Sequence, residues 1–570
     1  MTRFTSGLRS AGLALFLLAA PATAHAQGLA GPYLSAMQAD IRNDYANAAD
    51  YYVRALARDP KNPMLLQNGL VTFIGRGDVD GAVALARRLR EVEPENPIAT
   101  LVMVADAFAS EEYETALADV TREGIELNTL LAGLLKGWAE AGSGAFSDAA
   151  ATFETLRQND ALAAFGQFNK ALLLASAGDF EGAEDILART PEAAAVVGRV
   201  GLVARAQILN QLDRTADAIA LLDEGLANGL EDAVILDLRD RLMSGEDIAF
   251  DVLDDPRDGA AQAVLSIAAA LGRENAERFA LVYARLASHL NPELVEAQLL
   301  QAELLGLQGQ FELASQAYLD VPRDSPLYLA AEIGRADALA ADGQADAAIE
   351  ALNRLTADFP DSFMAHTALA DALRGEERFA EAAESYSDAI AQVENPTRGH
   401  WFLFYSRGIS YERSDQWELA EADFRRALEL FPDQPLVLNY LGYSLVELRR
   451  NLDEAQTMIE KAVAARPTDG YITDSLGWVL YRLGKYEEAV APMERAVQLL
   501  PDDSVINDHL GDVLWMVDRK REARFQWRRA LSFEPEEEEA ERIRRKLEVG
   551  LDQVLEEEAG ESTDTAANGG

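Results

Sequence analysis

The residues that could carry out chemistry in this chain are few, and cysteine and histidine are the scarcest of them. The 570 residues include no cysteine and five histidines. Without cysteine the chain cannot form a disulfide, a cysteine-ligated zinc site, an iron–sulfur cluster or a thiol nucleophile. No histidine after residue 26 has a second histidine at helical spacing, so we expect these histidines to be structural or to lie on the surface rather than to bind metal. They are His289, His366, His400 and His509.

Acidic residues form the other candidate cluster. Asp254, Asp255 and Asp258 lie in the acidic stretch Ser244–Gly259 and could hold calcium, but their spacing matches no calcium-binding loop. We also find no phosphate-binding loop, no nucleophile elbow and no His-Glu-x-x-His motif. An enzyme would need a catalytic constellation in Ser244–Gly259, where we find only acids. The sequence therefore predicts no catalysis, no metal site and no cofactor.

The net charge argues against one class of partner. The chain has 96 acidic and 51 basic residues, which gives a formal net charge of −45. A surface this negative repels a phosphate backbone, so we expect no nucleic acid partner.

The N-terminus has the pattern of an export signal. Arg3 and Arg9 precede the apolar stretch Ala11 to Ala20, and Ala24-His25-Ala26 is the small-x-small pattern of a cleavage site. The apolar stretch is too short to cross a bilayer, so we predict no transmembrane anchor. Because the chain has no cysteine to follow the cleavage site, we also predict no lipid anchor. These features predict a signal peptide, cleavage after Ala26 and a periplasmic product.

Near the C-terminus, a pattern of small, apolar and proline residues recurs every 34 residues and predicts the elements that make up the fold. A small residue lets a neighbouring helix approach closely, a stripe of alanines marks one face of a second helix, and proline ends the unit. Each unit is therefore expected to be a helical hairpin. The clearest copy has Leu476, Gly477, Leu480, Ala489, Ala496 and Pro501, which recur as Leu510, Gly511, Leu514, Ala523, Ala530 and Pro535.

This pattern resembles the tetratricopeptide repeat (TPR) family, and the C-terminal copies resemble those of exported proteobacterial TPR proteins. About fourteen copies can be placed along the chain. The resemblance implies an all-α fold, a right-handed α-solenoid of TPR-like hairpins. We divide the chain into a signal peptide (1–26), an N-terminal half-array (27–230), an irregular acidic connector (231–262), a C-terminal half-array (263–535), a capping helix (536–554) and a disordered acidic tail (555–570).

The resemblance also implies a binding surface. In this family the first helix of each unit lines a concave groove, where partners dock as extended peptides or helices. The Lys, Asn and Arg residues with which one subtype holds a carboxylate are replaced here by acids, amides and aromatic residues, which suit a partner with basic and apolar segments. For Trp478 and Trp515, packing between helices is an equally good interpretation. By register, the groove residues are Tyr405, Asn439, Tyr443, Asp474, Trp478, Tyr481, Asp508, Asp512 and Trp515.

These features together predict a periplasmic scaffold or adaptor that binds other cell-envelope proteins or peptides and catalyses no reaction. Two alternatives remain open. One is a recruitment factor for a carboxyl-terminal processing protease. The other is a component of an exopolysaccharide or outer-membrane assembly system.

Overall fold

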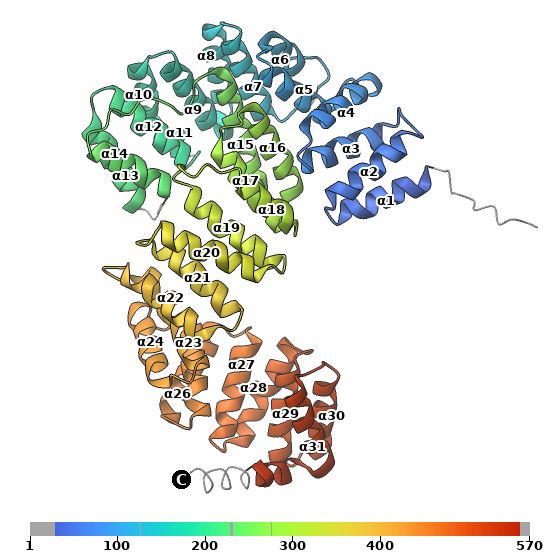
Figure 1. Ribbon diagram of the computed structural model, residues 1–570, viewed down its shortest axis with the longest axis vertical. Coiled ribbons are helices and arrows are strands. Elements are labelled where there is room, and N and C mark those ends of the chain that lie inside the picture. The colour runs from blue at the N-terminus through green and yellow to red at the C-terminus, as the bar shows by residue number, and fades with distance from the viewer. Residues whose placement is uncertain (1–28, 126, 196, 228–231, 275, 559–570) are drawn as a thin grey trace, which may run out of the picture. The chain divides into compact units, whose positions relative to one another are not determined.

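The computed structural model describes residues 29–125, 127–195, 197–227, 232–274 and 276–558. In these ranges the chain is all-α, without a strand, and its helices form repeating hairpins (Figure 1). The predicted fold class is confirmed. The chain divides into two compact units, an N-terminal unit (Met1–Gln344) and a C-terminal unit (Ala345–Gly570). None of the helices in the described ranges has both the length and the apolar character that crossing a membrane requires.

The helices of the N-terminal unit are α1 (Ala30–Ile41), α2 (Tyr45–Leu56), α3 (Pro63–Gly75), α4 (Val79–Val92), α5 (Pro97–Ala109), α6 (Tyr113–Val120), α7 (Thr129–Gly142), α8 (Phe146–Thr155), α9 (Asp160–Ser176), α10 (Phe180–Arg189), α11 (Pro191–Ala195), α12 (Arg199–Gln211), α13 (Thr215–Ala227), α14 (Ala233–Met243), α15 (Pro256–Arg273), α16 (Glu277–Leu290), α17 (Val295–Leu307), α18 (Phe311–Tyr318) and α19 (Tyr328–Ala341). Those of the C-terminal unit are α20 (Ala345–Asp358), α21 (Phe363–Gly375), α22 (Phe379–Ala391), α23 (Trp401–Arg413), α24 (Trp417–Leu430), α25 (Pro435–Glu447), α26 (Leu452–Ala465), α27 (Gly470–Arg482), α28 (Tyr486–Leu499), α29 (Ser504–Met516), α30 (Lys520–Leu531) and α31 (Glu537–Val549).

The glycines of the repeat pattern allow the two helices of a hairpin to pack closely. A Cβ atom added to Gly477 would lie 2.5 Å from the side chain of Met493, and one added to Gly511 would lie 2.4 Å from that of Trp527. Real Cβ atoms essentially never approach so closely. The repeat spacing therefore places a glycine in the first helix against a bulky side chain of the second.

Short polar residues start many of the helices. Asn62 and Asn96 each accept a hydrogen bond from the backbone N–H three residues on, and a proline follows each of them at the first helical position. Asp469 and Asp503 cap α27 and α29 in the same way. These caps satisfy donors that a helix otherwise leaves free, so these four helices begin where the sequence signals a start.

In the N-terminal unit the chain turns back on itself. α15 packs against α7, and α16 packs against α3 and α5, so that α15 and α16 lie inside the arc of the earlier helices (Figure 1). Gly259 permits the closest approach, since an added Cβ would lie 2.2 Å from the ring of Trp138. The predicted boundary at 231–262 therefore differs from the structural division at Gln344, because the first helices of the expected C-terminal half-array belong to the N-terminal core.

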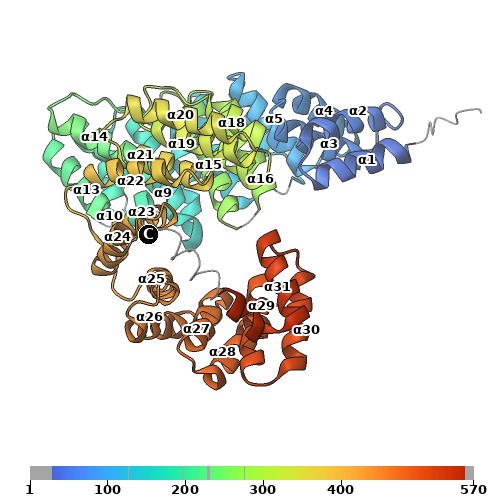
Figure 2. The same ribbon diagram turned by 60° about the horizontal axis from the view of Figure 1, so that its bottom comes forward.

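The C-terminal unit continues as successive hairpins and ends in a cap (Figure 2). α31 lies within the range expected for a capping helix, and a further helical segment covers 551–558. Gly550, with φ of 93°, separates the two. Residues 555–558, expected to begin a disordered tail, are thus helical. The rest of that tail and the signal peptide lie outside the described residues.

Candidate protein-binding groove

The predicted groove residues lie on the first helices of four successive hairpins in the C-terminal unit, α23, α25, α27 and α29. They fall into three sets defined by their distance from the repeat glycine at Gly408, Gly442, Gly477 or Gly511. Three residues before the glycine stand Tyr405, Asn439, Asp474 and Asp508; one residue after it stand Tyr443, Trp478 and Asp512; four after it stand Tyr481 and Trp515.

The groove begins with aromatic side chains at α23 and α25. The ring of Tyr405 lies 5.9 Å from that of Tyr440, nearly perpendicular to it, and 5.6 Å from that of Trp401. Tyr405 and Tyr443 are both partly exposed. Burial raises the pKa of each, so both hydroxyls stay neutral. This part of the groove offers apolar ring surface with hydroxyl groups at its margin.

Trp478 forms the centre of an aromatic stack on α27 and α29. Its ring centroid lies 4.8 Å from that of Tyr481 and 4.0 Å from that of His509, with nearly parallel planes. Its indole N–H donates a hydrogen bond of 2.6 Å to Glu447. Because Trp478 is only 8% exposed, it packs between helices and offers the groove little more than an edge.

His509, one member of this stack, forms a buried ion pair with Asp474. The His509 Nδ1 lies 2.9 Å from Asp474 Oδ2, and the side chains are 11% and 8% exposed, respectively. Burial opposes the charge on His509, but the carboxylates of Asp474, Asp508 and Asp512 outweigh it and raise the pKa of the imidazole. His509, expected to be structural or on the surface, is thus structural.

Three side-chain acceptors remain without a donor at equivalent positions of neighbouring first helices. They are Asn439 Oδ1, Asp474 Oδ1 and Asp508 Oδ1, which we call the acceptor row. Each atom is buried and has no hydrogen-bond partner within the described part of the chain. Buried acceptors are normally satisfied, and leaving one unpaired costs free energy. A donor supplied from outside the chain would remove that cost.

The last position of the groove is covered by the chain's own cap. Lys546 of α31 is fully buried, and its Nζ lies 2.7 Å from Asp508 Oδ2 and 2.7 and 2.8 Å from the two oxygens of Asp512. The N–H of Trp515 donates a 3.0 Å hydrogen bond to Asp552 of the following segment. Asp508, Asp512 and Trp515 therefore contact the cap, whereas no hydrogen bond or ion pair within the described residues joins the cap to the groove residues of α23, α25 or α27.

A family model described as tetratricopeptide repeat matches residues 134–196, 333–396, 405–469 and 441–504. These stretches of the chain are tetratricopeptide repeats. A TPR repeat-containing protein of Pseudomonas aeruginosa is 37% identical to it over 87 residues, a match that spans 15% of each chain. TPR arrays are scaffolds for protein–protein interaction and are generally not catalytic.

Two solved structures are similar over longer stretches. The crystal structure of the APC/C hetero-tetramer Cut9-Hcn1 contains a chain that is 15% identical, with 91% of this chain and 96% of that chain covered and a TM-score of 0.37. A tetratricopeptide repeat protein from Parabacteroides merdae is 18% identical, with 45% of this chain and 98% of that chain covered and a TM-score of 0.37.

The TPR groove of the N-terminal unit is filled by the chain itself. Arg278 of α16 donates a 2.6 Å hydrogen bond to Asp40 of α1, which also accepts one of 3.0 Å from Thr72. Tyr45 donates to Gln308, which follows α17. First helices that would line an open groove are here part of a shared core.

The acidic residues of the connector have structural roles. Asp255 caps α15, and Asp258 accepts hydrogen bonds from the backbone of Asp254 and Asp255 and from the side chain of Asn291. In the described part of the chain, no group of three or more His, Asp or Glu residues has a geometry suited to a metal ion.

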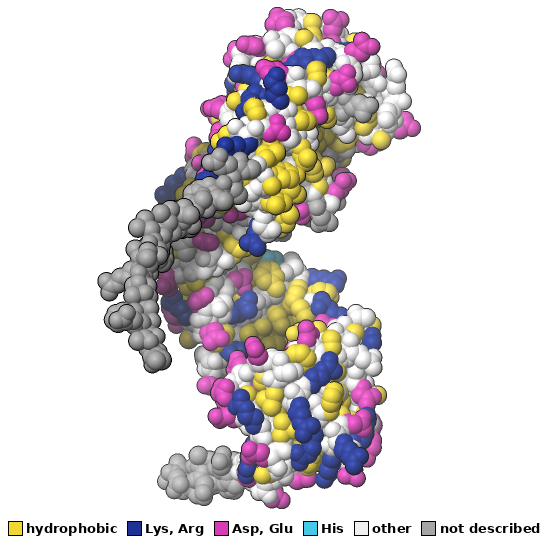
Figure 3. Space-filling view, turned by 90° about the vertical axis from the view of Figure 1, so that its right-hand side faces the viewer, with side chains coloured by type: hydrophobic (Ala, Val, Ile, Leu, Met, Phe, Trp, Pro, Cys, Tyr) yellow, Lys and Arg dark blue, Asp and Glu magenta, His cyan; other side chains and the backbone are white. Residues whose placement is uncertain are grey.

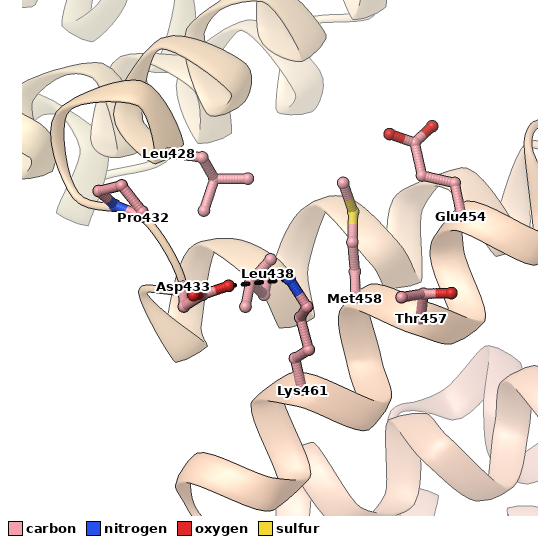
Figure 4. A pocket seen from close by; sticks show the side chains of 8 residues that line it. All are labelled: Leu428, Pro432, Asp433, Leu438, Glu454, Thr457, Met458 and Lys461. Atoms are coloured by element: carbon pink, nitrogen blue, oxygen red, sulfur yellow. Dashed lines mark hydrogen bonds and ion pairs between the residues drawn. The ribbon is translucent and has the colours of Figure 1, made fainter.

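A separate hollow of about 470 Å³ lies on the other side of the C-terminal unit, where α24, α25 and α26 meet (Figure 4). Leu428, Leu438 and Met458 form its apolar wall, and Lys461 reaches across to Asp433 at 3.0 Å. The hollow contains none of the predicted groove residues.

The sequence did not predict the role of Lys546, which covers the last position of the groove. Its helix was expected to be a cap, and Arg542 stands one turn earlier on the same face. This i, i+4 basic pair, beside acidic positions of the last repeat, is the signal that could have indicated the contact.

Proposed function

We propose that this chain is a periplasmic scaffold and that its C-terminal TPR groove binds protein segments carrying basic and apolar side chains. The observation that carries the proposal is the acceptor row, with the aromatic surface of Tyr405 and Tyr443 beside it. A lysine or arginine of a partner supplies the missing donors, and its apolar neighbours pack on the rings.

The chain contains its own example of such a contact. α31 places Lys546 between Asp508 and Asp512, three residues before and one residue after the glycine of the last repeat. The equivalent positions one repeat earlier are Asp474 and Trp478, and two repeats earlier Asn439 and Tyr443. A partner segment that continues the line of the cap would meet one acid, one amide and two aromatic side chains.

The periplasmic location rests on the signal-peptide pattern that ends at Ala26. In that compartment the scaffold would bind other envelope proteins. Recruitment of a carboxyl-terminal processing protease and participation in exopolysaccharide or outer-membrane assembly remain the two narrower possibilities. Affinity capture from periplasm would separate them, through recovery of a protease with its substrates or of synthase and porin components.

The groove itself is tested with a fluorescent peptide of alternating arginine and leucine. We expect Asp474→Asn to weaken binding about tenfold, because it removes the charge while an amide can still bond to His509. Glu460→Gln is the matched control, since it removes one exposed acid from α26, a second helix. Equal binding by both variants, measured by fluorescence anisotropy, would show that the peptide does not use the acceptor row.

A further inference from the structure

The outer face of α30 is basic in a chain that is otherwise strongly acidic. α30 contains one acid, Glu522, and its five bases are Lys520, Arg521, Arg524, Arg528 and Arg529. As the second helix of the last hairpin, α30 packs against α29 and α31. Figure 3, which faces the side of Figure 1 where α30 lies, shows Lys and Arg side chains gathered on this part of the C-terminal unit.

Three side chains share the exposed face of this helix. Arg521, Phe525 and Arg528 follow each other at spacings of four and three residues, and we call them the arginine face. All three are exposed, and Phe525 is 62% exposed. The opposite side of α30 is anchored in the core by Ala523, Trp527 and Ala530, so the arginine face is held outward on a rigid helix.

The two arginines of this face have no acidic partner. Neither Arg521 nor Arg528 forms an ion pair within the residues that the structure describes. Nearby Arg519, by contrast, binds Glu494 at 2.8 Å and Glu522 at 2.6 Å. In a chain with 96 acids and 51 bases, unpaired exposed cations on either side of an exposed aromatic ring leave positive charge available to a partner.

We propose that the arginine face docks on the surface of an anionic lipid bilayer. Second helices form the outer side of a repeat array, which suits a planar partner better than a peptide that needs a groove. Arginines bind anionic headgroups, and an exposed phenylalanine between them inserts at the acyl boundary. The net charge of −45 repels the same membrane from the rest of the surface, so this face sets the orientation of docking. The inference does not depend on the peptide groove.

Cosedimentation of the full chain with vesicles tests the proposal. We expect binding to vesicles of phosphatidylglycerol and phosphatidylcholine at low salt, and none to phosphatidylcholine alone. Arg521→Glu with Arg528→Glu should lower the bound fraction about tenfold, and Phe525→Ala should lower it by a smaller factor. Circular dichroism should show both variants folded, because all three positions are exposed.

The matched control reverses two exposed arginines that do have acidic neighbours. Arg354 lies 3.6 Å from Glu350 and Arg450 lies 3.7 Å from Glu418, and their double reversal to Glu changes the net charge by the same amount. This control should bind vesicles as the natural chain does. The proposal is overturned if the natural chain does not bind, if the control loses binding equally, or if the Arg521→Glu, Arg528→Glu variant still binds. The proposal is also overturned if soluble poly-glutamate, added at the same total negative charge as the vesicles, displaces the protein from them. That result would assign the arginine face to an acidic protein.

Discussion

The two units of this molecule use the same repeat but treat its inner face in opposite ways. In the N-terminal unit α15 and α16 fill the space against α3, α5 and α7, and polar groups such as Asp40 find partners within the chain. In the described part of the C-terminal unit, Lys546 covers the last position of the groove, and Asn439 and Asp474 keep unpaired acceptors. A repeat face becomes core where the chain returns to it and remains a candidate binding surface where it does not.

The largest effect should follow removal of Lys546, the buried cation that covers the last position of the C-terminal groove. Lys546→Met removes the directly bonded cation of the buried carboxylates Asp508 and Asp512 and leaves them only Arg542, at 3.8 and 3.6 Å. This should cost about 3 to 5 kcal/mol of the free energy of unfolding of the C-terminal unit. Urea unfolding measures the loss, and amide exchange should show α31 opening. Adding Asp508→Asn and Asp512→Asn should restore most of the stability. Unchanged exchange in α31 would show that this contact does not hold the cap.

A second change should disrupt the packing of α15 in the inner face of the N-terminal unit. Gly259→Val places a branched side chain against the ring of Trp138 and should destabilise the N-terminal unit by about 3 kcal/mol. Gly306→Ala on α17 is the control, because nothing lies within 4 Å of an added Cβ there. In thermal unfolding, the first transition of Gly259→Val should occur at a lower temperature than that of the natural chain. The transitions of Gly306→Ala should be unchanged. If both variants behave alike, the contact between α15 and α7 contributes little.

Two arginine-to-methionine substitutions, one on the inner face of each unit, compare the two faces directly. Arg278 bonds to Asp40, which is 10% exposed, whereas Arg482 lies 3.2 Å from Glu447, which is 40% exposed. Arg278→Met should cost about 2 kcal/mol, since it strips a cation from a buried carboxylate. Arg482→Met should cost less than about 1 kcal/mol, as water replaces the lost partner. Equal losses in denaturant titrations would remove the distinction between filled and open faces.

The smallest expected effect is a pH dependence in the C-terminal unit. The folded pKa of His509 is raised, so its charge contributes stability that is complete below about pH 6.5 and is lost as the pH rises through the folded pKa. The groups that face it are Asp474, Asp508, Asp512 and Lys546. The stability difference between the natural chain and His509→Gln should therefore shrink as the pH rises from 6 through the folded pKa. A constant difference would mean that His509 is not charged in the fold.

The hairpins were predictable because their causes are local. Gly477 and Gly511 lie against bulky side chains of the following helix, as the repeat spacing implied. The return of α15 and α16 was not predictable, since their amphipathic pattern fits the neighbouring repeat as well as a distant groove. Asp508 and Asp512 were placed correctly on a first helix, but their bonds to Lys546 depend on the path of the cap, which no local spacing determines.

We propose that the inner face of the C-terminal unit binds basic and apolar segments, whereas that of the N-terminal unit is occupied by α15 and α16. Hydrogen exchange of the full chain, with and without a saturating arginine–leucine peptide, tests it most directly. We expect added protection in α23, α25 and α27 and none in α3, α5 and α7. Protection of α3, α5 and α7 would show that the N-terminal inner face also binds the peptide. No change in α23, α25 and α27 would show that the C-terminal groove does not bind it.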